Sequence, residues 1–348
     1  MLSLAFLLVL VTAVCIILLL PLKGLLDTLI AVPILMMAQI VLLTQILSEL
    51  HLIGELGYAI GHLLILIIAS GVLYTRRKQL IVNRPSQIAL RRKLRQAVDA
   101  MREHWWVTVF TAIVLLYITS LVMTHLPQTA ADWDALVYHF PRAYFWLESG
   151  TAQHFPTDNF RMTEFPPNAS FIYAWILAFD GLQTIWLAVP QLVGAALTVF
   201  AMVGLARAVN APVAGAVIAG GLFLLLPNAI EKQYFTGYID LIVSGLVTSG
   251  VYFAVASLNH TENNRERMSK LCYTGICVGL AIGTKLTALV VLFVAGSLLS
   301  LYALQTYRLR GITILRQLTV ASLIGFLVLG SYNYVLNFIN YGNPISSQ

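Results

Sequence analysis

The sequence predicts an all-α protein that crosses a membrane many times. Apolar residues make up 59% of the 348 residues and charged residues only 10%, and the mean hydropathy is +0.83. A soluble domain contains about a quarter charged residues, so this composition excludes an ordinary soluble protein. Apolar runs of about 20 residues, each long enough to cross the hydrocarbon core, recur along the chain. We therefore expect a bundle of about ten transmembrane helices in an inner or plasma membrane.

The net charge of +6 does not indicate a nucleic-acid partner. The basic residues cluster at the ends of apolar runs, which is typical of membrane topology and of contact with anionic lipid. The three cysteines lie within apolar runs and form no CxxC pair, so neither a disulfide framework nor a zinc site is predicted.

The apolar runs define most of the predicted spans. The first run, 2–20, lacks the basic region and cleavage site of a signal peptide, so we interpret it as a retained helix. The stretch 271–304 is too long for one ordinary span and carries Gly279, Gly283 and Lys285 near its middle, which predicts a hairpin of two short helices. A charge that faces lipid costs about 3 kcal/mol or more, so Lys285 needs a polar cavity or a partner. The remaining predicted spans are 25–47, 52–74, 105–123, 185–209, 212–226, 238–258 and 314–336.

The positions of Lys and Arg orient these helices. The linker 75–104 holds nine of the 21 basic residues, so the positive-inside rule places it in the cytoplasm. The helix that begins at Trp105 then carries the polar stretch 128–168 to the extracytoplasmic face. The apolar segment 169–179 is only about half as long as a span. If this segment crossed the membrane, the basic residues after it would face the outside. If it lies in the interface, or enters the membrane and returns on the same side, most basic residues are cytoplasmic. The exceptions are then Arg142, Arg161, Lys232 and Lys285.

This topology divides the chain into three parts. Residues 1–75 form a three-span extension, 76–104 a basic cytoplasmic linker, and 105–348 the transmembrane core. The segments 227–238 and 337–348 are expected outside the membrane, beside the polar stretch 128–168. Several polar parts of the chain are therefore predicted to meet on one face.

The polar stretch 128–168, which we call the outer loop, is the expected site of chemistry. It contains five of the fifteen carboxylates in an otherwise apolar chain. A short helix is predicted over 141–149 with Gly150 as its end, and a second helix begins at Asn168 after Pro166 and Pro167. Both are rich in aromatic residues, as expected of interfacial helices at the level of the lipid headgroups.

Two acids at the start of this loop are candidate catalytic residues. Asp132 and Asp134 have the DxD form of metal-binding transferases, although a solvated loop would also explain them. Such an acid could act as a general base on an incoming hydroxyl or amine. Asp240, which opens a span, is a third candidate, with helix capping as the alternative. A divalent cation is left open, with Asp134, Asp240 and His139 as its ligands.

Cations on the same face could neutralise a phosphate. Arginine suits bidentate phosphate contacts, although an interfacial cation is also a common membrane anchor. His139 is a candidate metal ligand or second base, with an ordinary polar loop residue as the alternative, and Glu164 is either an acid or a helix-start charge. The predicted substrate-binding residues are Tyr138, His139, Arg142, Arg161, Glu164, Lys232 and Lys285.

Several motifs occur in the order found in GT-C fold glycosyltransferases. The sequence from about 105 to 348 resembles this family, most closely the protein O-mannosyltransferases and the aminoarabinose transferases of lipid A. The motifs are 133–142, Trp146, 165–167, 237–240, 279–285 and 340–344. The three N-terminal spans are additions to the pattern. Family members usually continue beyond a Gly-Asn-Pro element, so the resemblance implies a fragment or a shortened chain.

The resemblance implies a GT-C-like bundle and a polyprenyl-phosphate-linked sugar as donor, with a glycan, lipid or protein as acceptor. Asp134 then matches the acid near the acceptor, Asp240 a second acid near the donor phosphate, and Lys285 a lysine in the corresponding hairpin. Phe165 departs from the pattern, because some relatives carry a basic residue there. The alternative functions are a transporter or flippase of lipid-linked glycans and a scaffold subunit of an envelope complex.

Overall fold

The computed structural model describes residues 1–22, 24–80, 102–126, 132–181, 185–258 and 264–345. Helices dominate this part of the chain, and it contains no strand. Most of the predicted linker 76–104 lies outside the described residues. The prediction of an all-α polytopic membrane protein is confirmed, because eight described helices are long and apolar enough to cross a membrane.

The long apolar helices match the predicted spans closely. They are α1 (Leu2–Leu19), α2 (Leu25–Glu49), α3 (Glu55–Leu80), α5 (Trp105–His125), the 3-10 turn η3 (Ile185–Ala188) with α9 (Val189–Ala208), α12 (Asp240–Ser257), and the two halves of α14 (Ala288–Gly325), the second of which continues into the π-helix η4 (Phe326–Gly330). The other elements are η2 (Ala135–His139), α6 (Phe140–Ser149), α7 (Arg161–Glu164), α8 (Asn168–Phe179), α10 (Val213–Leu224), α11 (Pro227–Lys232), α13 (Asn264–Thr284) and α15 (Tyr332–Tyr341).

The predicted break at Lys285 is present, but the helices beside it are longer than expected. Helix α13 has 21 residues and begins before the apolar run. Glu266 and Lys270 form an i,i+4 ion pair of 3.9 Å along its first turns. The first half of α14 also has 21 residues and ends at Arg308. The hairpin therefore consists of two full-length helices, and Lys285 lies at its tip.

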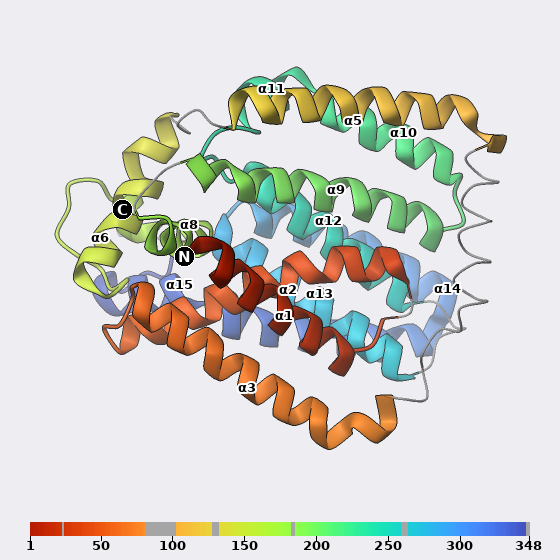
Figure 1. The fold of residues 1–348 in the computed structure, drawn as a ribbon. Helices are drawn as coiled ribbons and strands as arrows, with labels where there is room; N and C mark the ends of the chain where they lie inside the picture. Colours follow the sequence, from red (N-terminus) through yellow and green to blue (C-terminus); the bar gives the residue numbers. More distant parts are fainter. Residues whose placement is uncertain (23, 81–101, 127–131, 182–184, 259–263, 346–348) are drawn as a thin grey trace.

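Several polar parts of the chain meet at one end of the bundle. The N-terminus lies at this end, together with α6, α8 and α15 (Figure 1). We call it the outer end, because the positive-inside rule predicts that it faces the extracytoplasmic side. Helix α8 does not cross, since α9 begins at the same end. Eleven of the twelve residues of α8 are buried, so it is enclosed by protein rather than lying in the interface.

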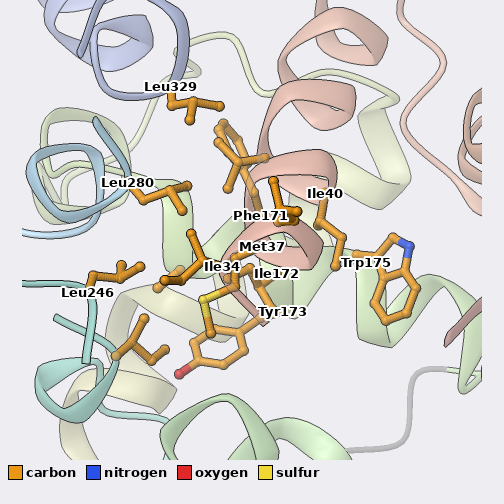
Figure 2. Packing of buried hydrophobic residues seen from close by; sticks show 14 of the residues in the cluster. Ile34, Met37, Ile40, Phe171, Ile172, Tyr173, Trp175, Leu246, Leu280 and Leu329 are labelled. Atoms are coloured by element: carbon orange, nitrogen blue, oxygen red, sulfur yellow. The ribbon is translucent and has the colours of Figure 1, made fainter. Parts of the chain in front are cut away.

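Helix α2 lies in the middle of the hydrophobic core. Its Ile34, Met37 and Ile40 pack against α8, and Leu280 of α13 and Leu329 of η4 complete the cluster (Figure 2). The division into an extension of residues 1–75 and a core stays a prediction, but α2 is as much a part of the interior as the later helices.

A stripe of glycines holds α13 against the second half of α14. Gly275, Gly279 and Gly283 recur every fourth residue, so they share one face of α13. A methyl group on Gly279 would collide with the carbonyl of Gly325, and one on Gly275 would collide with that of Ala321. Small residues at this spacing allow close approach of helices in membranes. The stripe therefore fixes the position of the α13 tip that carries Lys285.

Candidate active site

Arg142 joins the two halves of the outer loop. It lies on α6 and is fully buried. Its Nη1 donates to the carbonyl of Phe165 at 2.9 Å, its Nη2 to that of Pro166 at 3.1 Å, and its Nε to Ser170 Oγ at 2.8 Å. Burial lowers the pKa of Arg142 to about 10, so the guanidinium is still charged at neutral pH. The predicted phosphate contact of Arg142 stays a prediction, but its enclosed guanidinium is already hydrogen-bonded to Ser170 and to two backbone carbonyls, so it orders the loop.

Asp132 connects the start of the outer loop to the segment before α12. Its Oδ1 accepts a hydrogen bond from the backbone N–H of Ala135 at 3.1 Å, and its Oδ2 accepts one from Gly237 at 2.7 Å. Burial raises the pKa of Asp132, and these two hydrogen bonds oppose the rise. A side chain at Gly237 would collide with the ring of Phe140, so glycine is required for this approach. Asp132 therefore positions the site, and both of its oxygens are occupied.

Asp134 keeps its carboxylate partly open to solvent. Its side chain is 30% exposed, and Tyr138 Oη donates to Oδ2 at 3.2 Å. Arg161 Nη1 lies 4.0 Å from Oδ1, and the Arg161 side chain is 40% exposed. Ion pairs this exposed contribute little energy, so Arg161 can leave Asp134 for an anionic ligand. Of the two acids in the DxD pattern, Asp134 alone has the access that a general base requires.

Asp240 and Lys285 form a second acid–cation pair. Asp240 is the first residue of α12, and Lys285 lies in the break between α13 and α14. The two side chains are 45% and 37% exposed, respectively. The prediction that Lys285 needs a partner is therefore confirmed. Because Lys285 is at the tip of the hairpin, the pair lies at the outer end of the bundle.

Two glutamines that sequence reasoning missed hold Asp240 in place. Gln191 on α9 accepts hydrogen bonds from the backbone N–H groups of Leu241 at 3.1 Å and Ile242 at 3.2 Å. Its Nε2 donates to Gln233 Oε1 at 2.9 Å, and Gln233 Nε2 donates to Asp240 Oδ2 at 3.3 Å. Gln191 thus caps the first turn of α12. Capping this helix was the alternative role that the sequence offered for Asp240. The Asp240 carboxylate is left to Lys285 and Gln233.

His139 is neutral and is held in place through Nδ1, which accepts hydrogen bonds. Its Nδ1 lies 3.4 Å from Arg142 Nη2 and 2.9 Å from Ser170 Oγ. A guanidinium can only donate, so Nδ1 carries a lone pair and the ring proton resides on Nε2. Burial, with the charges of Arg142 and Lys285, lowers the pKa of His139 well below 6.5. Its Nε2 is buried and has no hydrogen-bond partner in the described chain.

This arrangement does not suit the divalent cation left open by the sequence. With its proton on Nε2, His139 offers a metal no free lone pair there, and its Nδ1 faces a guanidinium. The described His, Cys, Asp and Glu residues form no group of three or more that could hold a metal ion. Asp134 and Asp240 are each engaged with a cationic side chain instead. We therefore assign no chemical step to a metal.

Tyr238 lies close enough to all three candidate acids for their charges to act on its hydroxyl. Burial raises the pKa of its hydroxyl, and the negative charges of Asp132, Asp134 and Asp240 raise it further, in that order. The backbone of this segment is fixed by Tyr173 on α8, whose hydroxyl donates to the carbonyl of Tyr238 at 2.9 Å. Tyr238 was not among the predicted site residues, although it lies two positions before Asp240.

Lys232 and Glu164 take other places at this end. Lys232 ends α11 with an exposed side chain and has no ion-pair partner in the part of the chain described. Glu164 is only 4% exposed, and its carbonyl accepts hydrogen bonds from Asn333 Nδ2 at 2.8 Å and Asn337 Nδ2 at 3.1 Å. These contacts place α15 against the outer loop, as predicted for the C-terminal segment.

Comparisons with known proteins find no match, since no family model, curated protein or solved structure is similar to the chain.

Proposed function

We propose that the protein is a membrane glycosyltransferase that moves a sugar from a polyprenyl-phosphate donor to an acceptor at the extracytoplasmic face. The observation that carries this proposal is the pair of half-exposed contacts at the outer end, Asp134 with Arg161 and Asp240 with Lys285. One accessible acid and nearby exchangeable cations are the groups needed to deprotonate a nucleophile and to stabilise a departing phosphate.

Asp134 is the proposed general base. The acceptor hydroxyl or amine attacks the anomeric carbon, and Asp134 takes the proton that the nucleophile loses. The bond between the anomeric carbon and the phosphate oxygen breaks, and the lipid phosphate leaves with the electron pair. Tyr138 supports this role, because its hydroxyl donates to Oδ2 of Asp134 and leaves Oδ1, which now lies near Arg161, for the acceptor once Arg161 contacts the phosphate.

Lys285 and Arg161 are the proposed phosphate contacts. Each is now paired with an acid. The donor phosphodiester carries one negative charge and the departing lipid phosphate gains a second, so the phosphate competes best for these cations as the bond to the sugar breaks. Asp240, held by Gln233, would keep Lys285 in position before the donor arrives. The exposed apolar side chains of the long helices suit lateral entry of the polyprenyl chain from the outer leaflet.

A transporter or flippase of lipid-linked glycans is the second candidate, favoured by a charged pair at a helix break. Transporters of this kind usually carry broken helices in matching positions of two repeats. Within the described residues, the α13–α14 break has no counterpart that also carries an ion pair. A scaffold role would give the two exposed pairs no function.

A doubly labelled donor separates these functions. The full chain is reconstituted in vesicles with polyprenyl-phosphate hexoses or pentoses that carry ³H in the sugar and ³²P in the phosphate, with a membrane extract as acceptor. A transferase separates the two labels, so ³H appears in the acceptor and ³²P stays in the lipid. A flippase moves both labels across the bilayer at a constant ratio, and this result would refute the proposal.

A further inference from the structure

An apolar groove runs along the face where α13 meets the second half of α14. Its volume is about 390 Å³. Met268, Cys272 and Ile276 of α13 form one wall, and Val320 and Ile324 of α14 belong to the other. Gly325 also lines it where the two helices approach most closely, because a methyl group on Gly325 would collide with the carbonyl of Gly275.

The groove has one polar end. Arg316 and Gln317 line it there, whereas its other lining residues are apolar or small. Arg316 is exposed and has no ion-pair partner in the described part of the chain. Gln317 Oε1 is buried, with no hydrogen-bond partner among the described residues. Arg265 lies one helical turn before Met268 on the same face of α13, which adds a second cation at this end.

The length and placement of the groove suit one lipid chain. Arg316 and Val328 are twelve residues apart, which corresponds to about 18 Å along a helix. One leaflet contributes roughly 15 Å to the hydrocarbon core. The distribution of basic residues assigns the Arg316 end to the cytoplasmic boundary, opposite the candidate active site. The groove thus crosses the inner leaflet, with its charged end at the level of the headgroups.

We propose that this groove binds an anionic phospholipid of the inner leaflet, with an acyl chain between α13 and α14 and the phosphate on Arg316. The apolar walls select a hydrocarbon chain, and the unpaired guanidinium selects a headgroup with net negative charge. This site is independent of the proposed sugar transfer. It bears on the fold, because the lipid lies along the glycine stripe that positions the helix carrying Lys285.

The test compares two lipids that differ only in headgroup charge. The full chain is purified in detergent, stripped of lipid, and titrated with phosphatidylglycerol or phosphatidylcholine of identical acyl chains. Native mass spectrometry counts bound lipid, and thermal unfolding gives Tm. We expect phosphatidylglycerol to bind more tightly and to raise Tm more. Equal binding and equal Tm shifts would overturn the proposal, as would an equal Tm shift from glycerol phosphate without acyl chains.

Matched variants locate the site. Arg316→Gln should weaken phosphatidylglycerol binding roughly fivefold and leave phosphatidylcholine unchanged, whereas Arg207→Gln, an exposed arginine on α9, should change neither. Val320→Trp should fill the groove and remove the bound lipid, while Leu298→Trp, on an exposed face outside the groove, should not. Retention of the headgroup preference in Arg316→Gln, or of the lipid in a folded Val320→Trp protein, would refute the assignment.

Discussion

Lys285 and Asp240 form an ion pair across 45 residues of sequence. The pair exists because α13 ends at the outer end of the bundle, where α12 begins. Gln191 takes over the capping of α12, so the Asp240 carboxylate is free to hold the lysine. The fold therefore supplies a cation next to an acid at the membrane boundary, which is the arrangement that the proposed phosphate contact requires.

Replacing Lys285 with methionine should abolish function without unfolding the protein. Removal of a cation that stabilises a departing phosphate is expected to lower sugar transfer by roughly a hundredfold. The half-exposed pair contributes only about 1 kcal/mol or less, so Tm should change little. The control Arg207→Met removes an exposed cation at the last turn of α9, away from the pair, and should retain activity. A large loss of Tm in Lys285→Met would indicate a structural role instead.

The buried Arg142 should not tolerate even lysine. An ammonium cannot reproduce the forked donation to Phe165 and Pro166, so buried acceptors lose their partners. We expect Arg142→Lys to destabilise the protein by about 3 kcal/mol or more in chemical denaturation. Arg161→Lys, at a 40% exposed position, should stay within about 0.5 kcal/mol of wild type. Equal stabilities for the two variants would contradict the role assigned to Arg142.

Acidification should destabilise the fold through His139. Its folded-state pKa lies well below 6.5, so as the pH falls through 6.5 the unfolded chain binds a proton first. The contribution of His139 to the free energy of unfolding is therefore constant above pH 6.5. Below pH 6.5 this contribution decreases by up to about 1.4 kcal/mol per pH unit. Burial also lowers the pKa of His154, which adds to the slope.

His139→Gln should reduce this pH dependence, measured as Tm between pH 7 and pH 5. The exposed His104 at the start of α5 provides the control, because His104→Gln should leave the slope unchanged. A wild-type Tm that does not fall with pH, or a slope unaffected by His139→Gln, would count against a buried neutral histidine.

Gly237→Ala should displace the segment that leads into Asp240. The added methyl group collides with the Phe140 ring and with the side chain of Ala135, and overpacking of this kind costs about 1–3 kcal/mol. Transfer activity should fall together with Tm. Gly215→Ala on α10, where nothing lies within 4 Å of the added group, should preserve both. A Gly237→Ala protein as stable and active as wild type would contradict the close approach of Gly237 to Phe140.

The sequence predicted the features that depend on composition and length. Apolar runs located the spans, and the charge of Lys285 within a long run predicted both the hairpin break and the need for a partner. The short length of 169–179 identified a segment that does not cross. Helix α10, however, has only 12 residues, shorter than the predicted span 212–226, and η4 ends the last span at Gly330.

The details of the site depended on contacts that no local pattern encodes. Arg142 appeared available for phosphate, because the carbonyls that enclose it belong to residues 23 and 24 positions later. The DxD pattern alone did not separate Asp132 from Asp134, and only the family resemblance favoured Asp134. The hydrogen bond from the backbone N–H of Gly237 then showed that Asp132 is occupied. For Gln191 and Gln233 the sequence shows only an amide side chain near the end of an apolar helix, and this pattern is too weak to predict their contacts with α12 and Asp240. The assignment of a sugar donor rests on resemblance and on the site, and stays a prediction.

The central claim is that Asp134 is the base for sugar transfer, and one substitution tests it most directly. Asp134→Asn keeps an oxygen for Tyr138 and removes the proton acceptor. Transfer of labelled sugar from polyprenyl phosphate should fall by at least about a hundredfold, with unchanged Tm and detergent elution. Asp158→Asn, an exposed acid in the same loop, should transfer sugar at the wild-type rate. Undiminished turnover by Asp134→Asn would contradict the account.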